Sequence, residues 1–121
     1  MAKPTNYKFD NVVAPAPDKV EGTKFDRGKL RYDLLPPECL EALVEVLTFG
    51  AQKYEAHNWQ KVEPLTERYI AALFRHIEAW RKGEGLDPDS GLHHLAHAMC
   101  NVMFLLWKEK QDENIDRDSL Y

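Results

Sequence analysis

Apolar residues recur at helical spacing in three stretches of the chain, over residues 36–54, 66–83 and 92–107. Pro36 and Pro37 stand where the first stretch opens, and proline is tolerated in the first turn of a helix. Thr66 suits the N-cap of the second stretch. No stretch alternates apolar and polar residues in the manner of a β-strand. The pattern predicts an all-α fold with three main helices.

The first two predicted helices each carry an apolar stripe that should face the core. The stripe expected in helix 36–54 consists of Leu40, Leu43, Val44, Leu47, Ala51 and Tyr54. The stripe expected in helix 66–83 consists of Ile70, Leu73, Phe74, Ile77 and Trp80, with Ala72, His76 and Ala79 beside it. Three helices leave apolar surface uncovered, so we expect a fourth short helix, a partner chain, or both. Beyond Lys108 the sequence is charged, and we expect it to fray.

The third predicted helix is apolar on nearly every side except for one polar stripe. His94, His97 and Asn101 form this stripe, because they project within about 60° of one another on a helix. A helix this apolar should be buried, and buried polar groups need hydrogen-bond partners. The stripe therefore either satisfies itself inside a packed core or lines a pocket that holds a metal, a water or a substrate. His76, from the preceding helix, is available to join it.

Two acids, Glu84 and Asp87, lie in the glycine-bounded loop 83–91 that leads into this stripe. Their oxygens suit Mg²⁺ or Mn²⁺, and added imidazole favours Mn²⁺ over Mg²⁺. The alternative is a turn with solvated acids and an N-cap. A second acidic row on helix 36–54 consists of Glu38, Glu41 and Glu45. It has the ExxE spacing of helical metal hydrolases. It projects away from the expected core stripe, however, and charged residues in that position normally face water.

Residues 22–33 form a loop whose cations suit a polyphosphate. The candidates are Lys24, Lys29 and Arg31 for the phosphates, with Asp26 and Asp33 as acceptors for a base or sugar. The alternative is a solvated loop or an ion-pair network. Further along, Lys53, Asn58 and Trp59 offer a charge, an amide and a stacking ring for a nucleobase. The alternative is a capped helix end with a core tryptophan.

Length and charge narrow the class of protein. The 121 residues suit one domain, which we divide into an arm (1–22), a helical domain (23–110) and a charged tail (111–121). A net charge of −4 argues against a general nucleic-acid binder. No apolar run has membrane-spanning or signal-peptide character, so we expect a cytoplasmic protein that does not bind membranes. Cys39 and Cys100 lack the spacing of a zinc site, and we expect both to be free thiols.

Several short motifs together resemble those of one enzyme family over about residues 22–108. They are Gly22-Thr23-Lys24-Phe25-Asp26, Gly28-Lys29, Arg31, Asp33-Leu34-Leu35-Pro36, Phe49-Gly50-Ala51, Lys53-Tyr54, Asn58-Trp59, Arg75-His76, Gly83-Glu84, Asp87, Ser90-Gly91 and His94-Leu95-Ala96-His97-Ala98. The set resembles the phage dATP/dGTP diphosphohydrolases, distant relatives of the MazG-like all-α nucleotide pyrophosphohydrolases. The resemblance implies a MazG-like helical bundle that forms a homo-oligomer, a dimer or tetramer. It also implies cleavage of dGTP or dATP to the monophosphate and pyrophosphate with Mg²⁺ or Mn²⁺, in phage nucleotide metabolism in the host cytoplasm.

The resemblance does not carry over a metal site unchanged. MazG enzymes hold metal with ExxE on one helix and ExxD on the next, whereas this chain has His76 and Ala79, then His97 and Asn101, near those places. Our hypothesis is that metal is bound by Glu84, Asp87, His94 and His97. In this hypothesis His76 or His97 activates the attacking water, Asn101 positions it, and the loop cations hold the phosphates.

Three alternatives remain open at this point. An HD-type nucleotide phosphohydrolase is also helical and rich in histidine, but it normally needs a His-Asp dipeptide, which this chain lacks. A non-catalytic phage protein that binds a nucleotide or signalling molecule would show tight binding without hydrolysis. A helical interaction module would use the polar stripe for packing alone.

Overall fold

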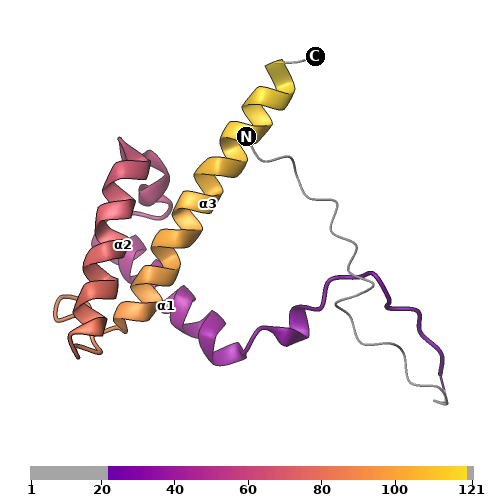
Figure 1. Cartoon of the computed structure of the whole chain (residues 1–121), viewed down its shortest axis with the longest axis horizontal. Helices are drawn as coiled ribbons and strands as arrows, with labels where there is room; N and C mark the ends of the chain where they lie inside the picture. The colour runs from indigo at the N-terminus through magenta and orange to yellow at the C-terminus, as the bar shows by residue number, and fades with distance from the viewer. Residues whose placement is uncertain (1–21, 120–121) are drawn as a thin grey trace. The chain divides into compact units, whose positions relative to one another are not determined.

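The computed structural model describes residues 22–119, with side-chain environments up to Ile115 (Figure 1). Its elements are the short 3₁₀ helix η2 (Tyr32–Leu34), helix α1 (Pro37–Lys53), the 3₁₀ helix η3 (Asn58–Lys61), helix α2 (Leu65–Arg81) and helix α3 (His94–Ser119). Within the described range no strand forms, and the sole β-type pairing is an isolated bridge between Leu86 and His93. The all-α prediction is confirmed. Most of the predicted arm, residues 1–21, lies outside the described residues.

The chain divides into two units, Met1–Pro36 and Pro37–Tyr121. The described part of the first unit is a loop ending in η2. It is organised locally by Arg31, whose Nε and Nη2 donate to the two carboxylate oxygens of Asp33 at 2.9 and 2.7 Å. The second unit contains all three α-helices and is described next by itself.

Helices α2 and α3 lie side by side and run in opposite directions, with α1 also packed on α3 (Figure 1). The core is a cluster of Val46 from α1 with Ala96, Cys100 and Phe104 from α3. Trp59, carried by η3, stacks on the Phe104 ring at a centroid distance of 4.4 Å. η3 thus supplies the short extra helix that the uncovered apolar surface predicted.

The predicted core stripes of the first two helices were wrong in part. In α1, Val46 is buried while Leu40 and Val44 are each 48% exposed; Tyr54, just after the helix, is exposed as well. In α2 the side that faces α3 carries His76, whose ring contacts His94 and His97, and Tyr69, whose ring packs on Phe104. Of the large residues expected to face the core there, Leu73 and Ile77 are half-buried, whereas Ile70, Phe74 and Trp80 are exposed.

Helix α3 also differs from its prediction in two respects. One side of it is exposed along Leu95, Met99, Val102 and Leu106, so the helix is not buried all round. It also continues past Lys108 to Ser119, where we expected fraying. Glutamate, lysine and glutamine favour helix, and Lys108 pairs with an acid one turn later at 3.1 Å.

Two further expectations concern the thiols and the membrane. Cys39 and Cys100 are both free, the first exposed and the second buried, which confirms the prediction of free thiols. Over residues 22–119, none of the helices combines the length and apolar character needed to cross a membrane.

Candidate functional site

The predicted site residues converge where the loop between α2 and α3 folds back on the start of α3. Gly83 and Gly91 adopt positive φ angles of 104° and 73°, which glycine accommodates without strain. Two backbone bonds close the loop: Asp87 N–H donates to the Leu92 carbonyl at 2.8 Å, and His94 N–H donates to the Gly85 carbonyl at 2.9 Å. This closure directs the loop acids toward the imidazoles of the two helices.

Glu84, His94 and His76 form a hydrogen-bonded chain. His94, 3% exposed, places its Nε2 at 2.6 Å from Glu84 Oε1 and its Nδ1 at 2.8 Å from His76 Nδ1. A carboxylate only accepts, so His94 donates from Nε2 to Glu84; its Nδ1 then serves as the acceptor for His76 Nδ1–H. The Nε2 atom of His76 is then left with a free lone pair.

Ser90 organises a second set of contacts around Asp87 and His97. Its hydroxyl and its backbone N–H both donate to Asp87 Oδ2, at 3.0 and 3.2 Å. The Leu92 N–H donates to the same Ser90 hydroxyl oxygen at 3.1 Å, and His97 Nε2 lies 2.7 Å from it. Because the one hydroxyl proton goes to the carboxylate, His97 donates from Nε2 and keeps a lone pair on Nδ1.

The two sets of contacts meet where His76 stacks on His97, with ring centroids 4.5 Å apart and planes 7° from parallel. Burial, and secondarily the neighbouring His97, lowers the pKa of His76 from 6.5 to about 4. Burial also lowers the pKa of His97, although the nearby Asp87 partly offsets the effect. Burial of Asp87 opposes its ionisation, but the hydrogen bonds from Ser90 outweigh it and hold the pKa below its ordinary value. At neutral pH this gives unprotonated imidazoles beside a carboxylate.

This arrangement can hold a divalent metal ion. One ligand atom each from His76, Asp87 and His94 lies within 4.8 Å of the others. Metal ligands must be unprotonated, and Nδ1 of His94 accepts from His76, so a bound ion would take the place of the hydrogen bond between these two rings. Two imidazole nitrogens and one carboxylate oxygen suit Mn²⁺ better than Mg²⁺, which prefers oxygen ligands. The donor set therefore suits the metal that the sequence predicts. Of the four expected ligands it contains Asp87 and His94, joined by His76. Glu84 is bonded to His94, and His97 lies outside the set.

Other predicted residues are not brought into this cluster by the described contacts. Asn101 is 5% exposed and lies one turn beyond His97, but it forms no hydrogen bond with another described side chain. Lys53 pairs with Asp89 of the loop at 2.8 Å, and Trp59 is used by the core, which favours its structural alternative. Asn58 is half-buried in η3. The remaining candidates belong to the unit Met1–Pro36: Lys24, Asp26, Lys29, Arg31 and Asp33.

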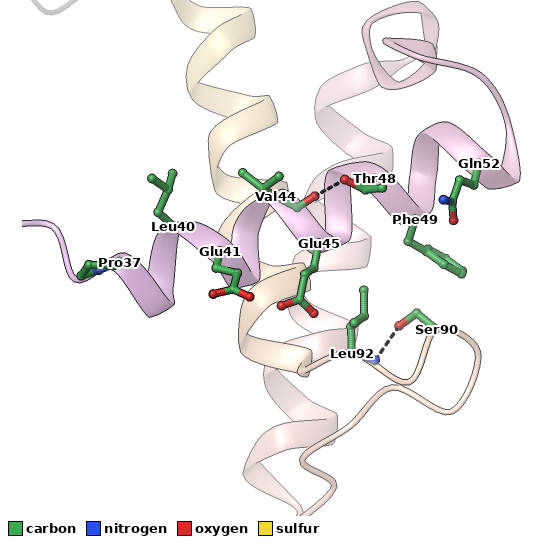
Figure 2. A pocket seen from close by; sticks show the side chains of 10 residues that line it. All are labelled: Pro37, Leu40, Glu41, Val44, Glu45, Thr48, Phe49, Gln52, Ser90 and Leu92. Carbon is green, nitrogen blue, oxygen red and sulfur yellow. Dashed lines mark hydrogen bonds between the residues drawn. The ribbon is translucent and has the colours of Figure 1, made fainter.

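A groove of about 610 Å³ borders the cluster and was not predicted from the sequence. It is lined by α1 and the loop, through Pro37, Leu40, Glu41, Val44, Glu45, Thr48, Phe49, Gln52, Ser90 and Leu92. Figure 2 shows Glu41 and Glu45 extending from α1 toward the segment that carries Ser90 and Leu92. Both acids are exposed, as expected, and both line this groove. The contacts of Ser90 with Asp87 and His97 were also missed, since the sequence showed this residue only as part of the Ser90-Gly91 motif.

Comparison with known proteins identifies the family. The family model described as dATP/dGTP diphosphohydrolase, N-terminal, matches residues 19–118. A protein of Salmonella phage PMBT28 named dATP/dGTP diphosphohydrolase is 41% identical over 86 residues, which are 71% of this chain and 29% of that relative. The chain thus spans less than a third of the relative's length, and no solved structure matches it. The match over most of its length shows that the chain belongs to the dATP/dGTP diphosphohydrolase family, in the N-terminal region that the family model describes.

Proposed function

We propose that this chain carries the site of a metal-dependent diphosphohydrolase that converts dGTP or dATP and water to the monophosphate and pyrophosphate. The observation that carries the proposal is the convergence of His76, Asp87 and His94 into one set of metal donors. The name of the phage relative supports the substrate class. We place the activity in the cytoplasm, with free nucleotides and not nucleic acid as substrates.

His76, Asp87 and His94 would hold the metal, with Glu84 beside them. When bound, a divalent ion supplies charge neutralisation for the phosphate chain and makes water more acidic. Glu84 has a positioning role, because its hydrogen bond orients the ring of His94.

His97 is the candidate general base. The sequence allows His97 to be a ligand or a base, and its bond to the Ser90 hydroxyl favours the second role. That bond occupies Nε2, so Nδ1 is the atom that takes a proton from the attacking water. The lowered pKa keeps Nδ1 unprotonated near neutral pH. Asn101, one turn further along α3, would orient the water through its amide.

The phosphates need cations that the cluster itself lacks. We propose that Lys24, Lys29 and Arg31 bind the phosphates, with Asp26 and Asp33 contacting the sugar or base. Lys53 has a second possible role here, because its partner Asp89 lies in the site loop. Asn58 and Trp59 stay weaker candidates, since the Trp59 ring already packs on Phe104.

The test is product analysis with a panel of nucleoside and deoxynucleoside triphosphates in Mn²⁺ or Mg²⁺. We expect purine deoxynucleoside monophosphate and pyrophosphate, and no turnover after chelation of the metal. His97→Ala should abolish turnover with the fold retained, whereas His93→Ala, at an exposed neighbouring ring, should not. Retained activity in His97→Ala rejects its role. Tight nucleotide binding without hydrolysis by the wild-type chain rejects the enzyme in favour of a binding protein.

We also propose that the chain forms a homo-oligomer through α2 and α3. Both helices expose large apolar residues, spaced three or four apart on α3 and four and six apart on α2. The residues are Ile70, Phe74 and Trp80 on α2, and Leu95, Met99, Val102 and Leu106 on α3. An exposed apolar surface of this extent is typical of an interface. In sedimentation experiments Phe74→Glu or Val102→Glu should give monomers, and Arg68→Glu, at an exposed position about 120° around α2 from Phe74, should not; unchanged assembly in both interface variants rejects this surface.

A further inference from the structure

We propose that the groove beside α1 binds the nucleobase of the substrate, and that Glu45 and Glu41 select a base carrying amino and ring N–H donors, guanine above all. This inference rests on the proposed function, because it assigns the part of the nucleotide that the metal cluster does not bind. The groove's volume of about 610 Å³ lies within the usual range of small-molecule sites.

The lining of the groove suits a base and not a phosphate chain. Its walls are mainly apolar, and its charged members are the two carboxylates, with no lysine or arginine among the lining residues. Carboxylates would repel a triphosphate, whereas a flat aromatic ring gains from apolar contact. Phe49 offers such a ring from the wall, and an aromatic face can stack on a base.

The position of the groove connects it with the proposed chemistry. Ser90 lines the groove and also bonds His97 and Asp87. Phe49 lines it as well and meets His97 edge-on, at a centroid distance of 6.5 Å. The groove and the cluster therefore share a wall, so a base held in the groove can direct its phosphates past Ser90 toward the metal donors.

The chemistry of the two glutamates identifies the base. Neither carboxylate forms an ion pair with any residue in the described range, and an ionised carboxylate only accepts hydrogen bonds. Thr48 lies between Glu45 and Phe49 in the sequence, and its hydroxyl already donates to the Val44 carbonyl at 2.8 Å. Guanine presents two adjacent donors, N1–H and the 2-amino group, which match the two oxygens of one carboxylate. Adenine offers its 6-amino group alone, and thymine has no amino group.

Hypoxanthine provides the sharpest test, because it differs from guanine by lacking the 2-amino group. We would measure kcat/KM for dGTP and dITP, and binding of dGMP and dIMP by calorimetry, with Mn²⁺ present throughout. We expect the wild type to favour guanine about tenfold or more, since a site that pairs with an N–H rejects an analogue without it. In Glu45→Gln or Glu41→Gln this preference should fall to about threefold or less, because an amide cannot accept both bonds.

Glu109→Gln is the matched control, since that residue is exposed on α3 and lines neither the groove nor the cluster; its guanine preference should equal that of the wild type. Equal affinity of the wild type for dGMP and dIMP overturns the proposal, as does an unchanged preference in both groove variants and in the double variant. Absence of dGMP binding also overturns it. If no triphosphate is hydrolysed, the proposed function fails, but the two monophosphates still decide whether the groove selects a base.

Discussion

Lowering the pH from 7 to 5 should destabilise the metal-free chain, and His76 should account for a large share of the loss. The groups facing this ring are His94 and His97 from α3, Asp87 from the loop and Arg75 on its own helix. Burial is the main reason that its pKa falls from 6.5 to about 4 in the folded chain. Between pH 4 and pH 6.5, His76 binds a proton in the unfolded chain but stays unprotonated in the folded chain. The stabilising effect is therefore complete above pH 6.5 and is lost as the pH falls toward 4.

The size of the effect follows from the same two values. At about 1.4 kcal/mol per pH unit, the interval from 6.5 to 4 corresponds to roughly 3 kcal/mol, of which about 2 kcal/mol is lost by pH 5. The His76 ring is not fully buried, so solvent screening reduces the loss. We expect about 1 kcal/mol at pH 5.

Urea unfolding with a chelator present, at pH 7.5 and pH 5, measures this loss. His76→Gln should lose about 1 kcal/mol less than the wild type between the two pH values. The exposed His93→Gln is the control and should behave as the wild type. A residual pH dependence should remain in His76→Gln, because the pKa of His97 is also lowered by burial. If His76→Gln and the wild type lose the same stability, the ring is not held neutral by its surroundings.

Three further predictions concern the metal, the loop and the core. Mn²⁺ at about one hundred times its Kd should stabilise the wild type by about 2.7 kcal/mol and should stabilise Asp87→Asn far less, as a thermal-shift titration would reveal; equal shifts would place the ion elsewhere. Ser90→Ala should lower the free energy of unfolding by about 1–3 kcal/mol and reduce kcat, because the hydroxyl has three hydrogen-bond partners. Wild-type values of both, measured by urea unfolding and by kinetics, would contradict this prediction. Phe104→Ala should cost about 3–5 kcal/mol and alter the fluorescence of Trp59, which loses its stacking partner; a cost below 1 kcal/mol would mean that the core closes around the gap.

The sequence predicted the elements that depend on local pattern. Three helices follow from apolar spacing, and the polar stripe of α3 follows from the spacing of His94, His97 and Asn101. The stripe also pointed to the loop acids, because Glu84 and Asp87 directly precede it in the chain. These predictions depend on residues close in sequence, where helix geometry fixes relative direction.

The packed sides of α1 and α2 depend on other helices and were predicted less well. Both helices have apolar residues over more than one side, so the pattern allows two faces and tertiary contact decides between them. Bulk favoured Phe74 and Trp80 for the core, whereas both are exposed and Tyr69 and His76 contact α3 instead. The role of Ser90 was equally hidden, because it requires the loop to be closed by backbone bonds between residues that the pattern does not connect.

Two surfaces of the chain can be separated by experiment because they share no residue. The groove is lined by α1 and the loop, whereas the exposed apolar residues of the proposed interface, among them Phe74 and Val102, belong to α2 and α3. A glutamate at either position should therefore change the oligomeric state without altering the preference for guanine over hypoxanthine. If a monomeric variant keeps that preference but loses turnover, the groove is complete in one chain and the catalytic cluster needs a residue from a second copy.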